Sequence, residues 1–415
     1  MALLRDRDFR LLFAGQGISR LGDGLYTAAV AWLAWALTHR PSAVALVTVA
    51  AYAPTFLATV IGASYADRYD RRRLMIATDL VRAAVVALAP LLLALGLLNL
   101  TLLVVAAALL SLIGAPFAPA RNAIVPQIAP AERLLEANSL LQVAFRAAFF
   151  VGPLLLAPLL AIGSLELVLA LDVLTFLASA GTLAAIRVRP VARIEQPLGL
   201  RADLAAGVSA LRAQPDVLIV IATFVLALLA ASGFLTVGVV ALVGAGMGGS
   251  GGDYGLLLGI AGVTEVLGAL VLAHLPLRSL ALTAVLAWAL LGAFRFPLGL
   301  AQTPTIAAVL LAMTGFASAL TDIPLIALVQ QRIPERHLAK ALGLWEAGIA
   351  GALAIAPFVA AATIEQVGVR RAFMLSGALL IVLAATAAIV LSRIATASSR
   401  PAPVGVPVPS LEKGH

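Results

Sequence analysis

The sequence predicts an all-α integral membrane protein with twelve transmembrane helices in two six-helix bundles. Of its 415 residues, 62% are hydrophobic and only 12% are charged, and its mean hydropathy is +1.07. A soluble domain contains roughly 45–50% apolar and about 25% charged residues. Apolar runs of ~20 residues, the length that crosses a bilayer, recur along the whole chain. A soluble core of this length would not need so much apolar sequence, so we expect the chain to lie in a membrane.

Polar breaks divide the apolar sequence into twelve expected spans. They cover approximately residues 11–37, 43–66, 74–97, 100–119, 138–160, 165–186, 216–243, 254–274, 279–299, 304–329, 341–363 and 371–393. A longer polar segment separates two sets of six, which gives an N-terminal bundle (1–186), a cytoplasmic central loop (187–215) and a C-terminal bundle (216–395). Residues 396–415 are rich in proline and are expected to form a disordered tail.

Two connections have an unusual composition. The central loop has helical spacing from Leu198 onward, so this part is expected to lie along the membrane surface. The connection between the seventh and eighth spans, residues 244–253, is rich in glycine and is expected to be a flexible hinge.

The positions of arginine and lysine predict the topology. One side of the spans carries almost all the basic residues of the connections, and the other carries only Arg40, Arg370 and Arg371. Short cytoplasmic loops are enriched in these residues. We therefore expect both termini in the cytoplasm, and a first helix that is retained rather than cleaved as a signal peptide. Scarce lysine beside abundant arginine, alanine and leucine indicates a GC-rich bacterium, so the expected location is the bacterial cytoplasmic (inner) membrane.

An internal repeat supports the division into two halves. At an offset of 204 residues, Pro130 and Pro153 in the first half match Pro334 and Pro357 in the second. Several apolar positions between these prolines match as well. Related halves of this kind are typical of membrane transporters.

The composition excludes several other classes of protein. The chain has no cysteine, which rules out disulfides and thiolate metal sites, and its four histidines are widely scattered. The net charge of +8 comes from short loops between spans, so it indicates topology rather than a nucleic-acid-binding surface. There is no phosphate-binding loop Gly-x-x-x-x-Gly-Lys-Ser/Thr and no nucleophile–base pair at a membrane face. We therefore expect no metal, no cofactor, no nucleic-acid partner and no enzymatic activity.

The loop between the second and third spans is densely charged. Its charges are Asp67, Arg68, Asp70, Arg71, Arg72 and Arg73. The loop resembles the signature of the major facilitator superfamily, roughly Gly-x-x-x-Asp-Arg-x-Gly-Arg-Arg/Lys. Ala63 occupies the first glycine position, with Gly62 one place earlier, and Asp70 replaces the second glycine. Together with twelve spans in two related halves, the loop implies the major facilitator fold and alternating access by two rocking bundles.

Three further motifs are similar to those of one branch of the superfamily. The loop variant Asp-Arg-x-Asp-Arg-Arg occurs with Arg-Leu-Gly-Asp in the first span (20–23) and Pro-Ala-Arg-Asn after the fourth (119–122). This combination resembles the exporter branch that contains macrolide efflux pumps and catecholate-siderophore exporters. Gly152 and Pro153 in the fifth span are similar to the core of the antiporter signature, whose flanking glycines are absent here. The resemblance implies an exporter and leaves its substrate open.

The resemblance also implies a gate at the cytoplasmic face. Its residues are Gly62, Asp67, Arg68, Arg71, Arg72 and Glu346. The family pattern places Asp67 against the positive N-terminal end of the eleventh helix, near Ala341. The loop arginines would bind carboxylates, carbonyls or anionic lipid heads and latch the two halves together. Glu346 is expected in the first turn of the eleventh helix, where the helix dipole favours an acid and where it would face this loop.

Ionisable residues within the spans are candidates for function, because each costs at least ~2.5–3.5 kcal/mol at mid-bilayer. Arg20 and Asp23 lie one turn apart on one face of the first helix. They form either a local ion pair that neutralises itself, or a carboxylate that lines the central cavity while Arg20 adjusts its affinity for protons. Gly22 and Gly24 would allow close helix contacts around this position.

Glu265, in the middle of the eighth span, has no basic neighbour in the sequence. Arg146 in the fifth span and Arg295 in the ninth lie at similar depth. The family architecture brings the fifth and eighth helices together, so Arg146–Glu265 is the preferred pair. It is either a static lock between the halves or a lock that opens when Glu265 is protonated or displaced by substrate.

The remaining polar and aromatic residues in the spans also have alternative interpretations. Asp322, before Pro324 in the tenth span, is either a helix-breaking cap or a cavity acid. Asp172 and Arg82 are expected to act as packing or relay groups. The tryptophans are interpreted as anchors at the membrane interface rather than as the lining of an aromatic site. They are Trp32, Trp35, Trp288 and Trp345.

These observations predict an exporter of small amphipathic or drug-like molecules that is driven by proton antiport. The candidate proton carriers are Asp23, Glu265 and Asp322, and their candidate charge partners are Arg20, Arg146 and Arg295. The alternative is an exporter of a siderophore or another specific metabolite that is recognised by arginines in the spans. The expected partners are the substrate, protons and membrane lipids, and the expected state is a monomer.

Overall fold

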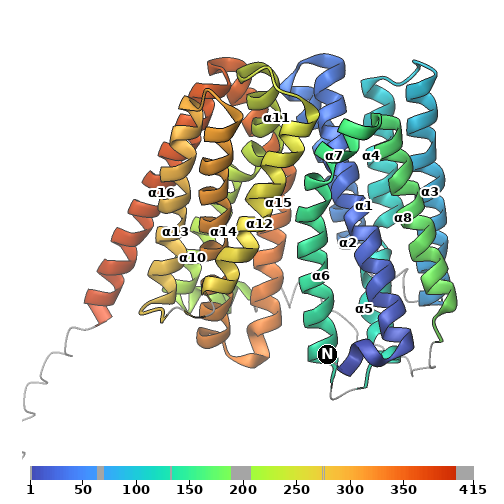
Figure 1. Cartoon of the computed structure of the whole chain (residues 1–415). Helices are drawn as coiled ribbons and strands as arrows, with labels where there is room; N and C mark the ends of the chain where they lie inside the picture. The colour runs from blue at the N-terminus through green and yellow to red at the C-terminus, as the bar shows by residue number, and fades with distance from the viewer. Residues whose placement is uncertain are drawn as a thin grey trace, which may run out of the picture.

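The computed structural model describes residues 2–62, 70–130, 133–187, 207–272, 274 and 276–398, and within these ranges every regular element is helical. The N-terminal half consists of η1 (Ala2–Arg5), α1 (Arg7–Thr38), α2 (Pro41–Gly62), α3 (Arg71–Ala94), α4 (Leu100–Gly114), α5 (Phe117–Ile128), α6 (Leu134–Leu154), α7 (Leu156–Ile162) and α8 (Leu165–Ala185). The C-terminal half consists of α10 (Pro215–Gly233), η4 (Phe234–Gly238), α11 (Val239–Ala241), η5 (Leu242–Gly246), α12 (Gly251–Leu272), α13 (Leu280–Arg295), η6 (Phe296–Leu300), α14 (Pro304–Arg332), α15 (Glu335–Val367) and α16 (Val369–Ser398). Figure 1 shows these helices running side by side in two groups, one from each half of the chain.

Nine helical stretches within the described residues are long and apolar enough to cross a membrane. They are α3, α4 with α5, α8, α10 through η5, α12, α13 with η6, α14, α15 from Lys340 onward, and α16 as far as Ile394. The helices α1, α2 and α6 pack alongside this set, α1 against α8 and α6, and α2 against α4 and α15. The chain is therefore a multi-pass membrane protein, and the count of twelve spans stays a prediction.

The two ends of the molecule differ in charge. The N-terminus lies at the lower end in Figure 1, where α1 and α3 begin and where α8 and α14 end. In the sequence these helix ends carry Arg7, Arg71, Arg72 and Arg332, and Arg187 follows α8 by two residues. We call this end the basic end and the other the opposite end. At the basic end α3 starts with a cap, because the Asp70 carboxylate accepts a hydrogen bond of 2.8 Å from the backbone N–H of Arg73. The aspartate that replaces a signature glycine thus has a local structural role.

Three hydrophobic clusters form the core. The first joins both halves near the opposite end, with Trp35 and Val44 from the N-terminal half and Val240, Tyr254 and Phe373 from the C-terminal half. The other two lie toward the basic end, and each belongs to one half alone. Van der Waals packing is a main source of helix association in a membrane. The halves are therefore packed together near the opposite end and have separate cores near the basic end.

The glycine-rich stretch 244–253 is helical at its two ends, and residues 247–250 connect these helices, so the flexible hinge stays a prediction. Its first residues complete the π-helix η5 and its last residues start α12. A Cβ added at Gly244 would collide with the indole of Trp35, and one at Gly251 would lie 2.7 Å from the indole of Trp32. These glycines allow α1 to approach the C-terminal half closely.

Candidate functional site

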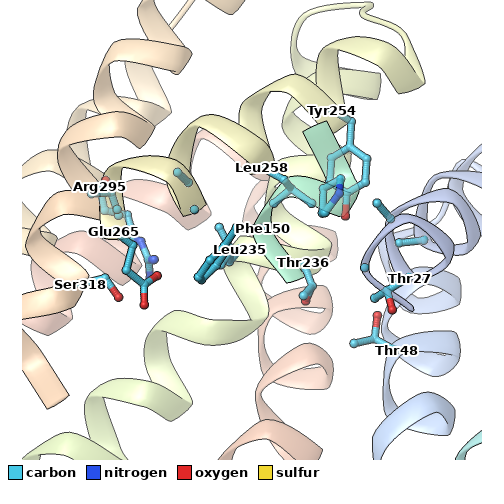
Figure 2. A pocket seen from close by; sticks show the side chains of 18 of the residues that line it. Thr27, Thr48, Phe150, Leu235, Thr236, Tyr254, Leu258, Glu265, Arg295 and Ser318 are labelled. Carbon is cyan, nitrogen blue, oxygen red and sulfur yellow. The ribbon is translucent and has the colours of Figure 1, made fainter. Parts of the chain in front are cut away.

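A cavity lies between the two halves of the chain, with a volume of about 860 Å³ that includes the part open to solvent. Its lining comes from α1, α2 and α6 of the N-terminal half and from η4, α12, α13 and α14 of the C-terminal half (Figure 2). Most lining residues are apolar. The polar members are Thr27, Thr48, Tyr52, Thr236, Tyr254, Glu265, Arg295, Thr314 and Ser318. Among the described residues the lining thus contains one acid and one base, in a mainly apolar wall with several hydroxyl groups.

Glu265 and Arg295 lie in the same part of this wall, close to Ser318 in the view of Figure 2. Arg295 is only 5% exposed. Its Nη1 donates a hydrogen bond of 2.9 Å to the backbone oxygen of Ala231, near the end of α10. One role of Arg295 is therefore to anchor α13 to α10 just before the π-helical turn.

The helices α6 and α12 pack along each other in antiparallel directions, so the expected contact between the fifth and eighth spans is confirmed. A Cβ added at Gly259 would lie 2.6 Å from Cβ of Leu154, and one at Gly262 would collide with the ring of Phe150. Continuing this register by one helical turn places position 146 at the depth of Glu265. The side chain of Arg146 lies outside the described residues, so the Arg146–Glu265 pair stays a prediction.

Asp23 lies in a charged cluster inside the N-terminal half. Its Oδ2 is 3.3 Å from Nη1 of Arg20, which confirms the ion pair within α1. Its Oδ1 is 2.6 Å from Nη2 of Arg82, so α3 supplies a second and closer partner. The guanidinium of Arg82 in turn stacks on Phe176 of α8, 4.2 Å from the ring centroid. Asp23 itself is absent from the cavity lining, which includes the adjacent Gly24. In this structure Asp23 is thus an ion-paired residue beside the cavity rather than part of its wall.

Two other candidate acids differ from their expected settings. Asp322 is half-buried in α14, and this helix continues through Pro324 to Arg332, so Asp322 is not a helix-breaking cap. Glu346 is exposed, and it lies about three turns into α15, because that helix already begins at Glu335. The expected interaction of Glu346 with the helix dipole is therefore wrong, since the dipole acts only within the first turn.

The charged loop is described in part. Gly62 is the last residue of α2, and Asp67 and Arg68 lie outside the described residues. Arg71 donates to the backbone oxygen of Ala123, at 3.4 Å. Arg72 binds the last carbonyls of α8, including that of Leu183 at 2.8 Å, where the helix dipole favours a cation. All these acceptors belong to the N-terminal half, so the contacts described for Arg71 and Arg72 hold this half together and do not join it to the other.

Gly152 and Pro153 lie where three helices meet. A Cβ added at Gly152 would be 2.6 Å from the backbone nitrogen of Leu25 and 2.7 Å from the backbone oxygen of Leu21, both on α1. The carbonyl oxygen of Pro153 would be 2.6 Å from a Cβ added at Gly255 of α12. The motif therefore permits the close crossings of α6 with α1 and with α12.

Gly152→Ala is expected to lower the thermal stability of the protein. The added methyl group meets the backbone of α1, which cannot rotate away, and overpacking of this kind typically costs about 1–3 kcal/mol. Gly351→Ala is the matched control, because this glycine is also helical and a Cβ there meets nothing within 4 Å. Thermal unfolding of the purified variants, followed by intrinsic fluorescence, measures the difference. Equal midpoints for the two variants would contradict the packing role of Gly152.

The tryptophans lie in the interior. Trp35, Trp288 and Trp345 are 5%, 4% and 6% exposed, respectively. Trp32 stacks on Tyr254, with 6.2 Å between the ring centroids, at the contact between the two halves. The expected anchoring at the membrane interface is therefore wrong for the three buried tryptophans. None of the four tryptophans is in the described lining of the cavity, whereas Tyr254, the partner of Trp32, is.

The complete burial of two acids in the N-terminal half was not predicted from the sequence. Asp79 was not singled out from the sequence, and Asp172 was expected only to pack or relay, yet they are 0% and 1% exposed. The signal that could have found Asp172 is helical spacing. Polar residues recur three or four positions apart on α1 and α8, and this pattern marks one continuous polar face within an apolar span.

Comparisons with known proteins agree with this fold. The family model described as transmembrane secretion effector matches residues 1–412. The crystal structure of the nucleoside transporter NupG is similar with a TM-score of 0.73 at 14% identity, over 94% of this chain and 99% of that one. A bacterial homologue of the human lysosomal transporter Spinster, in an inward-facing and unoccupied conformation, gives a TM-score of 0.68 at 13% identity, over 95% and 98%. A POT family transporter in complex with a thioalcohol-conjugated peptide gives 0.68 at 13%, over 95% and 97%. No curated protein matches.

At such identities the similar structures show the fold alone, whereas the family model covers almost the whole chain. The resemblance to the major facilitator superfamily is thereby confirmed. The chain belongs to the family of transmembrane secretion effectors and is a transporter of the major facilitator type.

Proposed function

We propose that this transporter exports small amphipathic or drug-like molecules across a bacterial cytoplasmic membrane by proton antiport. In this proposal twelve spans form two six-helix bundles, and the protein acts as a monomer. The basic end, with both termini, faces the cytoplasm, as its excess of arginine indicates. The opposite end, where one hydrophobic cluster joins the two halves, then faces outward, and an export substrate enters from the basic end.

The observation that supports this proposal most directly is the chemistry of the cavity. Small-molecule sites are mainly apolar with a few polar groups that fix orientation. The wall here has that character, and Glu265 is the acid among its described residues. A carboxyl group in such a wall can bind either a proton or the cationic group of a substrate. Competition between these two occupants would couple export of the substrate to entry of protons.

Transport into everted membrane vesicles tests the proposal. Vesicles that contain the protein and carry a proton gradient are expected to accumulate ethidium, a fluorescent amphipathic cation, and to release it when an uncoupler collapses the gradient. Vesicles without the protein are the control. Accumulation that continues unchanged after the gradient collapses would contradict proton coupling.

Glu265→Gln is expected to lower gradient-driven ethidium export by at least about tenfold, which corresponds to ~1.4 kcal/mol. The amide has nearly the same shape as the carboxyl group but can neither take up a proton nor attract a cation. Ser318→Ala is the matched control, since it removes a hydroxyl from the same part of the wall and leaves the carboxyl group. Its rate should stay within about twofold of wild type, as for most mild substitutions. Equal losses in both variants would show that Glu265 only shapes the wall.

Export of a siderophore or another specific metabolite is the second candidate, and the presence of Arg295 in the wall favours it. An arginine can bind an anionic or catecholate ligand through several N–H donors. Competition separates the two candidates. Inhibition of ethidium export by many unrelated drugs, including macrolides, supports a polyspecific pump, whereas inhibition by a catecholate siderophore alone supports the second candidate.

A further inference from the structure

A second polar region lies inside the N-terminal half, and we call it the buried seam. It consists of Gln16, Ser19 and Asp23 on α1, Asp79 and Arg82 on α3, and Asp172, Thr175 and Ser179 on α8. The helices α1 and α3 both pack against α8. None of these seam residues belongs to the described lining of the cavity, although Thr27, one helical turn after Asp23 on α1, does. The seam is therefore a separate feature from the substrate cavity.

The seam is almost completely buried and partly without hydrogen bonds. Gln16, Asp79, Asp172 and Ser179 are between 0% and 1% exposed. Neither carboxylate oxygen of Asp79 has a hydrogen-bond partner, and Oδ2 of Asp172 has none either. A buried polar atom without a partner is costly, and it needs either a proton to donate or a water molecule to bind. A carboxyl group that holds a proton, or a water molecule bound beside it, would make the seam suitable for proton transfer.

The contacts connect the seam from the basic end to Asp23. Ser179 lies six residues, or about 9 Å, before the end of α8 at the basic end. Its hydroxyl accepts a hydrogen bond of 3.1 Å from Nε2 of Gln16 and faces the carboxylate of Asp79. Further along α8, Oδ1 of Asp172 lies against Gly22, next to Asp23 on α1. Polar groups therefore extend from Ser179, about two turns from the basic end of α8, to Asp23 in the middle of the bundle.

The seam has one carboxyl group more than it has guanidinium groups, so its carboxyl groups can hold one proton. The ionisable groups that face its three carboxyls from the helices around them are Arg20 and Tyr26 on α1, Tyr52 on α2 and Arg82 on α3. Arg121 of α5 lies beyond the ring of Phe145, on which Arg20 also stacks. Three carboxyls thus face the two guanidinium groups of Arg20 and Arg82, which is one acid in excess. Neighbouring carboxyl groups that cannot all ionise share a proton.

We propose that the buried seam conducts protons between the basic end and Asp23, on a route separate from the substrate cavity. A proton bound at Asp23, with Asp172 beside it, passes to Asp79 and leaves to water at the basic end, which is the direction that proton entry requires, and no other covalent bond changes. Ser179 and Gln16 connect Asp79 to the basic end. Tyr52, which lines the cavity and lies near Asp23, links this route to the substrate site. The inference rests on the proposed proton antiport and adds the path by which the proton moves.

Infrared spectroscopy of the purified protein in lipid tests the seam without any substrate. Protonated carboxyl groups have a carbonyl band apart from that of carboxylates, and Asp79→Asn and Asp172→Asn are each expected to remove part of it. Asp216→Asn, which removes an acid from an ion pair with Arg332 at the basic end, should leave the band unchanged. A band that is identical in wild type, Asp79→Asn and Asp172→Asn would overturn the proposal.

The same band reports whether the route is continuous. In heavy water it shifts as each carboxyl group exchanges its proton for deuterium. Combined Gln16→Leu and Ser179→Ala substitutions, which keep all carboxyls, are expected to slow this shift by at least about tenfold. An exchange rate equal to that of wild type would show that protons reach Asp79 by another way and would overturn the route.

Ethidium transport separates the seam from the proposed function. In Asp79→Asn, gradient-driven export is expected to fall by at least about tenfold, while exchange of ethidium for ethidium without a gradient stays near wild type. Loss of both activities would mean that Asp79 serves the fold and would contradict proton conduction. If wild-type export ignores the gradient, the proposed function fails, and the infrared results still decide whether the seam carries protons.

Discussion

Asp23→Asn is expected to abolish gradient-driven ethidium export and to destabilise the protein. Asp23 lies 2.6 Å from Arg82 and 3.3 Å from Arg20, so a neutral amide removes the nearest counter-charge of both guanidinium groups. Removing one partner of a buried ion pair typically costs about 3–5 kcal/mol. Arg82 cannot easily turn toward water, because its guanidinium is held against the ring of Phe176. Thermal unfolding and the vesicle assay measure the two effects.

A second substitution separates the structural loss from the loss of coupling. Arg82→Gln added to Asp23→Asn removes the close unpaired charge, so most of the lost stability should return. Export should stay absent, because the carboxyl group is still missing. The control Asp216→Asn breaks a more exposed pair of the kind that contributes about 0–1 kcal/mol, and it should change neither quantity strongly. A double variant that regains gradient-driven export would show that Asp23 only balances Arg82.

The helices and their grouping could be predicted from the sequence because a span in a membrane must satisfy its own backbone hydrogen bonds. Long apolar runs are therefore helices, and charged breaks are their ends. The pair Arg20–Asp23 was also predictable, since residues three apart on a helix are neighbours. Hydropathy marks where a helix enters the membrane, however, and not where it begins. The start of α15 at Glu335, which precedes the apolar part of this helix, was missed for this reason, and with it the true position of Glu346.

Contacts between distant helices could not be predicted in the same way. Arg82 and Asp23 are 59 residues apart, and nothing in the sequence near either residue indicates the other. Asp79 follows a charged loop by two turns, where an acid is ordinarily expected in water, yet it is fully buried against α8. The glycines at 244–253 were interpreted as flexible because glycine permits both a turn and a close contact. The position of α1 shows that close contact is the use of Gly244 and Gly251.

Gly244→Leu is expected to prevent closure of the opposite end and to abolish transport. A Cβ at this position already collides with the indole of Trp35, and a leucine side chain would push α1 away from the C-terminal half. Because the chain has no cysteine, a single cysteine at Thr48 in the cavity wall reports access without interference. In intact cells a membrane-impermeant maleimide should label this cysteine in Gly244→Leu and spare it in the closed parent. Labelling that is equal in both would contradict the role of this contact, or the proposed orientation.

Trp35→Ala in the Gly244→Leu background tests whether the two residues act on each other. The smaller side chain makes room for leucine, so the double variant should be less labelled and should recover part of its transport, although Trp35→Ala alone costs packing energy of about 3–5 kcal/mol. Residues in direct contact give interaction energies of about 0.5–3 kcal/mol in such cycles, whereas independent residues give additive effects. Recovery therefore requires that Trp35 and Gly244 meet in the closed state. Additive losses in the double variant would place the closing contact elsewhere along α1.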